Sequence, residues 1–177
     1  ATDKVKADIK VAGAAGGFVG IGGALGVGVV HSTTEAFVGS SAQVEAGDQL
    51  KVEAKSENLD GSGSKVTAVA GAGGIIGLSA AFAVMNNTSS TQAYSGSGST
   101  LTGDTTVSAV TNTKQSASAT GIAVGVVAVG ASIAHAGSDT DTRATLGANV
   151  NASGAGLDVE ASGTDDNFAA ATAGSGG

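Results

Sequence analysis

The chain of 177 residues contains no cysteine, no proline and no tryptophan, and only 3% of its residues are aromatic. Without cysteine it has neither a disulfide framework nor a thiolate for metal binding or nucleophilic attack. Charged residues make up 13% of the chain, which is about half the usual share. The formal net charge of −7 argues against a nucleic-acid partner, because phosphates attract basic proteins.

Glycine is abundant instead, with 30 residues, and 41% of the chain is hydrophobic. Collagen is excluded because glycine has no three-residue period and proline is absent. The hydrophobic content also argues against a disordered chain. The apolar stretch 11–30 is as long as a membrane helix, but its many glycines weigh against that interpretation, so a membrane span is not expected. No signal peptide is recognisable at the N-terminus.

A short segment recurs three times along the chain. A glycine-rich apolar run precedes each copy. The copies are 34–39 (TEAFVG), 91–96 (TQAYSG) and 142–147 (TRATLG), and the runs are 11–30, 66–86 and 117–136. Such self-similarity is typical of repeat proteins. It predicts the end of a preceding repeat at 1–17 and repeat units at 18–74, 75–125 and 126–177, with the next unit truncated.

The first unit is longer than the others because it holds about four extra residues near 60–64, Asp60-Gly61-Ser62-Gly63-Ser64. Insertions of this kind belong in surface loops. The doublets Phe18-Val19, Ile75-Ile76 and Val126-Val127 occupy the same place in each unit. They break the local alternation of side chains, so we expect a bulge or a corner there.

Large and tiny side chains alternate within the glycine-rich runs. Val19, Ile21 and Leu25 are in one phase, and glycine or alanine fills the other. A period of two is typical of a β-strand. The tiny face must then pack very closely against something, since glycine strands are weak alone. Helices with close Ala-Gly contacts remain the alternative.

Other segments also predict strands and turns. Lys51–Ala54 alternates polar and apolar residues, and Thr105–Thr111 is rich in β-branched residues. Three polar clusters, 31–34, 86–89 and 137–140, and the Gly-Ser stretches 61–64 and 95–99 predict turns or loops. With so few aromatic residues, layers of Val, Ile, Leu and Ala are expected to fill an apolar core.

These patterns predict an all-β fold, a repetitive parallel β-solenoid (β-helix-like) with units of about 52 residues. A strand path of that length, on the order of 170 Å, is long for one slim coil. Each unit therefore forms either two coils or one wide, flattened coil. A β-solenoid that includes glycine-rich apolar helices is the alternative fold.

The order of motifs in each unit resembles the repeats of large bacterial surface proteins, the filamentous-haemagglutinin-like adhesins and autotransporter passengers. An alternating glycine/valine run leads into an Asn/Thr cluster, then Ala-aromatic-x-Gly, Val-x-Ala-Gly-Asp and Val-x-Ala. The likeness is clearest over 26–54 and 86–109. It implies secretion, a β-solenoid stalk and a role in adhesion or biofilm. The third unit departs from the pattern, with Thr145 in place of the aromatic residue.

Few residues qualify as a functional site. The two histidines, His31 and His135, are at unequal repeat positions and have no metal-ligand spacing. The weak metal candidate is Asp139 with Asp141, joined across a turn by Asp165 and Asp166, because carboxylates in turns can hold Ca²⁺. No catalytic or cofactor-binding residues are predicted. No acid/base constellation and no phosphate loop occurs, so an enzyme is not expected.

The sequence thus predicts a structural or adhesive segment of a secreted protein at the bacterial cell surface, which forms a stiff rod or fibre. Its partners would be neighbouring copies or repeats of the same protein, and host or surface glycans. A carbohydrate- or surface-ligand-binding β-solenoid module is the alternative function. No cofactor is expected apart from calcium.

Overall fold

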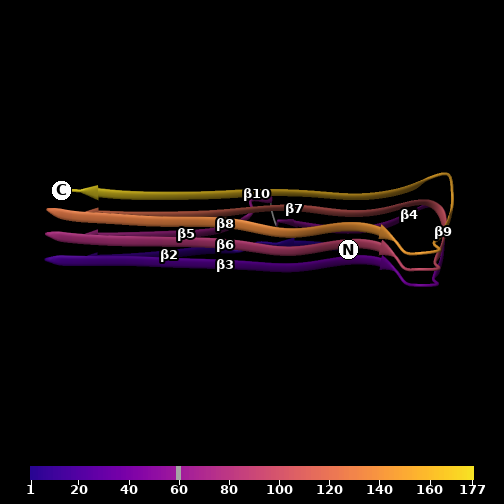
Figure 1. Ribbon diagram of the computed structural model, residues 1–177, viewed down its shortest axis with the longest axis horizontal. Helices are drawn as coiled ribbons and strands as arrows, with labels where there is room; N and C mark the ends of the chain where they lie inside the picture. The colour runs from indigo at the N-terminus through magenta and orange to yellow at the C-terminus, as the bar shows by residue number, and fades with distance from the viewer. Residues whose placement is uncertain (59–60) are drawn as a thin grey trace.

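A computed structural model describes residues 1–58 and 61–177 of the chain (Figure 1). The regular elements in these ranges are all β-strands, so the helical alternative is wrong there. No helix in the described ranges is long and apolar enough to cross a membrane. The strands are β1 (Thr2–Val5), β2 (Asp8–Gly16), β3 (Val19–Val38), β4 (Gln43–Asn58), β5 (Ser64–Gly73), β6 (Ile76–Ser95), β7 (Thr100–Val124), β8 (Val127–Leu146), β9 (Asn151–Ser153) and β10 (Leu157–Gly176).

The strands form two parallel sheets. The first sheet has the order β1-β4-β7-β5-β2, and β9 and β10 also pair with β7. The second sheet has the order β3-β6-β8. The chain passes from one sheet to the other in turn, so the strands of the two sheets run in opposite directions along the length of the molecule (Figure 1). This arrangement matches a β-solenoid with one wide, flattened coil.

The register joins equivalent positions of the recurring segments. In the second sheet Val19 pairs with Ile76, and Ile76 pairs with Val127. In the first sheet Glu57 pairs with Asn112, whereas Ser64 pairs with Gln115. Four more residues therefore lie between β4 and β5 than in the matching part of β7, as the insertion requires. Gly61 and Ser62 are exposed, which confirms a surface position for these two residues, whereas Gly63 and Ser64 are buried and Ser64 already begins β5. Asp60 of the predicted insertion lies outside the described residues.

Glycines form the corner at one end of the molecule, where each strand of the first sheet passes into the second. The predicted corner at the doublets is confirmed, since 17–18, 74–75 and 125–126 lie between strands. A Cβ on Gly74 would lie 2.1 Å from the carbonyl oxygen of Gly17, and one on Gly125 would lie 2.3 Å from that of Gly74. Successive corners therefore stack too closely for any side chain.

The turns at the other end share a left-handed backbone position. It is occupied by Ser41 with φ 57°, Gly98 with φ 70° and Asn149 with φ 57°. Glycine and asparagine accept this conformation most readily. The Gly-Ser stretch 95–99, predicted as a loop, forms one of these turns between β6 and β7.

The interior between the sheets is lined by the tiny phase of the alternating strands. The sheets come close enough for backbone to meet backbone, since a Cβ on Gly22 of β3 would lie 2.0 Å from the carbonyl oxygen of Gly71 on β5. Close packing of the tiny face is thereby confirmed. The predicted core of Val, Ile, Leu and Ala layers holds in part for the second sheet, where Ala81 and Ala83 are buried. Ile21 and Leu25 instead point outward and are exposed.

Polar residues divide the interior into two apolar clusters. One cluster centres on Met85, Val66 and their alanine neighbours, and the other on Val52 and Val107. Between them lies what we call the polar belt. Its members are buried and most carry hydroxyl groups: Ser32, Thr34, Ser56, Asn87, Ser89, Thr91, Thr111, Thr113 and Gln115. The expected all-apolar core is therefore wrong in its centre.

The polar belt also explains why three predicted turns are wrong. The clusters 31–34, 86–89 and 137–140 lie inside the unbroken strands β3, β6 and β8. Serine and asparagine favour turns when their side chains bond the local backbone. Here they bond each other instead, as when the Ser89 hydroxyl donates to Asn87 Oδ1 at 2.9 Å. The strand thus continues through a sequence that looks like a break.

A chain of hydroxyl groups crosses the polar belt, and we expect it to contribute to the free energy of unfolding. Thr142 Oγ1 donates to Thr111 Oγ1, which donates to Thr91 Oγ1, both at 2.8 Å. Thr111→Val removes the central hydroxyl and leaves two partners unpaired, which is expected to cost about 1–3 kcal/mol. The matched control is Thr33→Val on the exposed outer face of β3, expected to change stability by less than ~0.5 kcal/mol. Equal shifts of the urea midpoint for both variants would contradict the role of the belt.

Candidate functional site

A hollow on the outer face of the first sheet is the most site-like feature among the described residues. It encloses about 470 Å³ and is lined mainly by Lys4, Glu57, Asn58, Asn112, Lys114 and Asp166. The hollow lies beside β7, which is one continuous strand. Its neighbours β4 and β5 are separated by a break, and β1 and β2 next to them are separated by another. The breaks of neighbouring strands fall at the same level, so they leave space beside β7.

Two ion pairs hold the charged groups of the hollow. Lys4 Nζ lies 3.2 Å from Glu57 Oε1, and Lys114 Nζ lies 3.0 Å from Asp166 Oδ2. Asn58 bridges the strands, because its Oδ1 accepts a hydrogen bond from the Lys114 amide and its Nδ2 donates to the Val5 carbonyl. The lining thus offers paired charges and amides that suit a polar, uncharged ligand.

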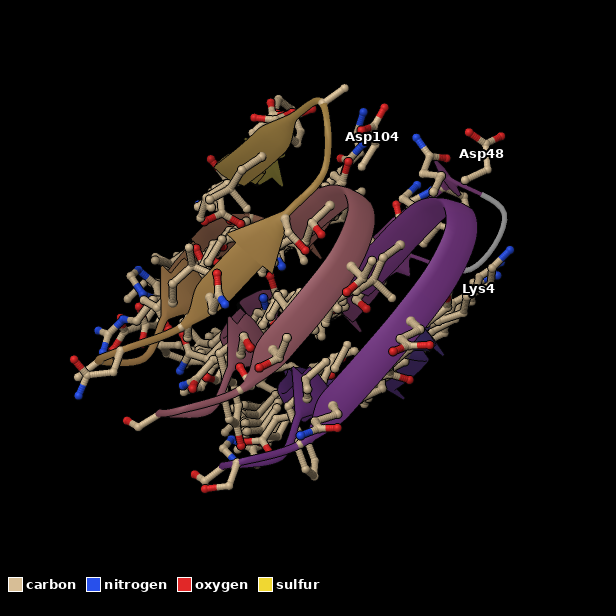
Figure 2. The ribbon with its side chains drawn as sticks, turned by 90° about the vertical axis from the view of Figure 1, so that its right-hand side faces the viewer. Lys4, Asp48 and Asp104 are labelled. Carbon is tan, nitrogen blue, oxygen red and sulfur yellow. The ribbon has the colours of Figure 1, made fainter. Side chains whose placement is uncertain are left out.

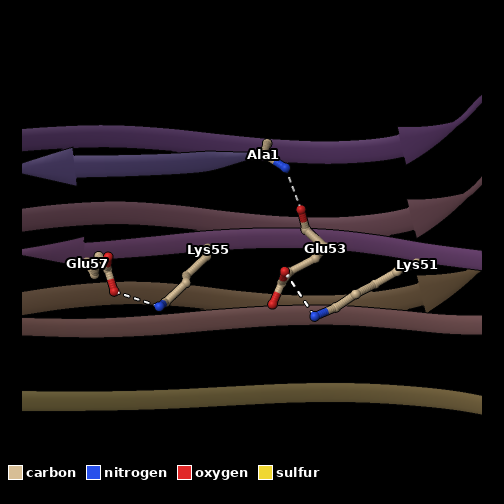
Figure 3. A network of polar contacts seen from close by, with 5 residues as sticks. All are labelled: Ala1, Lys51, Glu53, Lys55 and Glu57. Carbon is tan, nitrogen blue, oxygen red and sulfur yellow. Dashed lines mark hydrogen bonds and ion pairs between the residues drawn. The ribbon is translucent and has the colours of Figure 1, made fainter.

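A row of alternating charges leads along β4 to the hollow (Figure 3). Lys51 pairs with Glu53 at 3.1 Å and Lys55 with Glu57 at 2.7 Å. These residues share the outer face because every second residue of a strand points the same way. Beside the row, the nitrogen of Ala1 donates to the carbonyl of Glu53 at 2.5 Å.

The pairing shifts two ionisation equilibria in the row. Hydrogen bonds from Lys55 and from Lys4 hold the pKa of the Glu57 carboxyl below its ordinary value. The hydrogen bond to Glu57, followed by its charge, raises the pKa of Lys55. Both side chains contact solvent, which screens the pair. The interaction is complete at neutral pH and is lost as the pH falls through the folded-state pKa of Glu57.

The Glu57 pKa can be checked by NMR titration of its carboxyl carbon. We expect it below the ordinary range in the unaltered chain and shifted upward in Lys55→Met, which removes the main hydrogen bond. The control is Lys10→Met, because Lys10 pairs with Asp8 at 3.9 Å on β2. An unchanged Glu57 pKa in Lys55→Met would contradict the assigned cause.

The residues of the predicted calcium site are separated by the strand geometry. Asp139 and Asp141 lie on the exposed outer face of the second sheet, where Asp141 pairs with Arg143 at 3.3 Å. Asp165, although exposed, lies on the side of β10 that faces β8, where it accepts a hydrogen bond from Thr140, and Asp166 pairs with Lys114 on the outer face of the first sheet. The expected turn that would join them is a continuous strand. No group of three or more His, Asp or Glu able to hold a metal occurs within 1–58 and 61–177.

Asp165 has a different partner set, which the sequence does not reveal. Its carboxylate accepts hydrogen bonds from Thr113, from Ser138 at 3.1 Å and from Thr140 at 2.6 Å. Asp3 accepts likewise from Ser32. Each aspartate thus extends the hydroxyl network of the polar belt at one side of the stack, a structural role.

Two further sequence candidates also have simple positions. His31 and His135 are exposed on β3 and β8, the two edge strands of the second sheet.

Asp104, at the end of the molecule seen in Figure 2, accepts hydrogen bonds from the amides of Ala155 at 2.7 Å and Gly156 at 3.1 Å. It thereby fixes the connection between β9 and β10.

Comparisons of the chain with protein-family models, curated proteins and solved structures found no match. The likeness to adhesin repeats therefore stays a prediction from the motifs themselves. The arguments on function below rest on the strands, faces and contacts described above.

Proposed function

We propose that this chain is a structural segment of a secreted bacterial surface protein, built as a β-solenoid with a repeat of about 52 residues. The observation that carries the proposal is the strand register. Val19, Ile76 and Val127 stack on one another in the second sheet, and Asp8, Lys65 and Ser116 stack in the first. Matching residues of successive passes thus form continuous ladders in both sheets.

The ends of the ladders support growth into a rod. β3 and β8 are the edge strands of the second sheet, and further strands can pair with their free backbone groups. Each added pass would extend the stack by about 4.8 Å. The stiffness of such a rod comes from backbone hydrogen bonds and from a thin interior, and its acidic charge keeps it soluble. Display at the cell surface and adhesion follow from the resemblance to adhesin repeats.

Tandem fusions test the rod. Chains that carry one, two and three copies of residues 1–177 are imaged by negative-stain electron microscopy. We expect a single slab whose short dimension grows by roughly 15 Å with each copy, from three or more strands at about 4.8 Å spacing. Separate particles joined by flexible linkers would contradict the proposal.

The hollow beside β7 favours a second function, binding of a neutral carbohydrate. Its amides and paired charges can exchange hydrogen bonds with sugar hydroxyls. A glycan array probed with the chain and with Asn112→Leu tests this function. Binding that Asn112→Leu abolishes would support it, and an array without hits would reject it.

A further inference from the structure

The outer face of the second sheet is divided into an apolar and a polar half. Outward side chains of 19–27, 76–84 and 127–133 are apolar, and we call this region the apolar face. Along the same strands the outward residues then become polar, through Asn86 and Thr88 on β6. Ile21 is 69% exposed, Leu25 64% and Phe82 40%. These strands thus leave their large side chains in water, while their inward side chains in the same rows are glycine, alanine or serine.

The charges of the chain avoid the apolar face. β3, β6 and β8 carry charged residues only beyond it, namely Glu35, Asp139, Asp141 and Arg143. Every lysine belongs instead to a strand of the first sheet or to the connection between β1 and β2. The outer surface of the first sheet therefore carries most of the charges, alongside exposed Val69, Ile122 and Val124, and that of the second sheet is partly apolar. A contiguous exposed apolar patch of this kind marks an interaction site.

The size of the apolar face suits a pair of chains. Three strands about 4.8 Å apart and some ten residues at roughly 3.3 Å each give on the order of 500 Å² per copy, or ~1,000 Å² for a pair. Specific protein contacts need about 1,000 Å². Face-to-face packing of two such copies therefore reaches the lower limit of a specific interface.

The relief of the apolar face is self-complementary. Leu25, Phe82 and Ile133 lie side by side and form a ridge across the strands. The neighbouring row consists of Gly23, Ala80 and Ala131, which form a groove. A twofold axis along the stacking direction, midway between ridge and groove, places each ridge in the groove of the other copy. Twofold contacts require such self-complementarity.

We propose that two copies of this chain pair through their apolar faces, ridge into groove, with parallel stacking axes. Rows from Val19 to Val29 then overlap, so that Asn86 and His135 lie at the rim of the contact, and Asp139 of each copy stays outside it. A lipid surface fits less well, because acidic residues adjoin the face and the chain has no tryptophan to anchor at an interface. Face pairing differs from the edge-to-edge growth of a rod, and it does not rest on an adhesive function.

Analytical ultracentrifugation of the chain of residues 1–177 tests the pairing. We expect concentration-dependent dimers of the unaltered chain. Phe82→Glu, which places a charge in the ridge of both copies, should weaken association by ~30-fold or more. Leu25→Glu on β3 should act likewise. The matched control Thr88→Glu, on the same strand and the same outer face but in the polar half, should leave association unchanged.

Each outcome is decisive. A chain that stays monomeric up to about 100 μM contradicts the pairing, since interfaces at the low end of the size range still associate near such concentrations. If the Phe82→Glu and Thr88→Glu variants associate equally strongly, the contact is made by the sheet edges, and this result also overturns the face pairing. A monomer that floats with phosphatidylcholine vesicles assigns the face to lipid instead. Far-UV circular dichroism shows whether each variant keeps its strands.

Discussion

Gly22→Ala is expected to lower the free energy of unfolding by about 2–3 kcal/mol, because the added methyl group has no room. Its Cβ would lie 2.0 Å from the carbonyl oxygen and 2.8 Å from the carbonyl carbon of Gly71. Both atoms are backbone, so no side-chain rotation relieves the contact. The two sheets must move apart, and this separation breaks the packing of the neighbouring tiny residues. Urea denaturation measures the change.

The next residue supplies the control. Gly23 points outward, and a Cβ there meets nothing within 4 Å. Gly23→Ala should therefore stabilise the chain by roughly 0.4–1 kcal/mol, because alanine reduces the conformational freedom of the unfolded state. A loss of stability in Gly22→Ala together with a gain in Gly23→Ala would show that the tiny residues of β3 face the interior. If Gly23→Ala is the more damaging change, the faces are assigned the wrong way round.

Met85→Ala should cost about 3 kcal/mol, within the range of large-to-small substitutions in a core. Met85 is fully buried and is among the largest side chains of the interior. It fills the space above Gly28, where a Cβ would lie 2.7 Å from the Met85 sulfur. Alanine leaves a cavity between these strands, since Gly28 has no side chain that could fill it.

Met85→Leu is the matched control and should cost less than ~1.5 kcal/mol, because the volume is nearly kept. Thermal or urea unfolding of both variants gives the comparison. Similar stability of the alanine and leucine variants would show that Met85 does not fill the interior as described.

The strands could be predicted from the sequence, but the direction of their faces could not. Alternation of large and tiny residues predicts strands whichever face is buried, because the period of two is the same for both. Here the tiny face is inside, since backbone contact at Gly22 and Gly71 allows the sheets to approach closely. The usual expectation that large apolar residues form the core therefore fails for Ile21 and Leu25.

The polar clusters were misread for a related reason. Local preferences of Asn86, Asn87 and Ser89 favour a turn. In the strand, however, Asn86 points outward, whereas Asn87 and Ser89 are buried and bond each other inside the stack. The same alternation separates Asp139 and Asp141 from Asp165, which the predicted calcium site had joined. The hollow beside β7 has no local signal at all, because it arises from breaks that align only after the strands stack.

The register of the parallel strands is the central claim, and disulfide cross-linking tests it most directly. The chain has no cysteine, so introduced pairs react alone. Thr33 and Ser90 are paired neighbours on the outer face of β3 and β6, about 4.8 Å apart, a separation that a disulfide spans. We predict rapid oxidation of the double variant Thr33→Cys/Ser90→Cys. Thr33→Cys/Asn86→Cys, four residues out of register and about 14 Å apart, should stay reduced. Faster oxidation of the second pair, or none of the first, would contradict the stacked register.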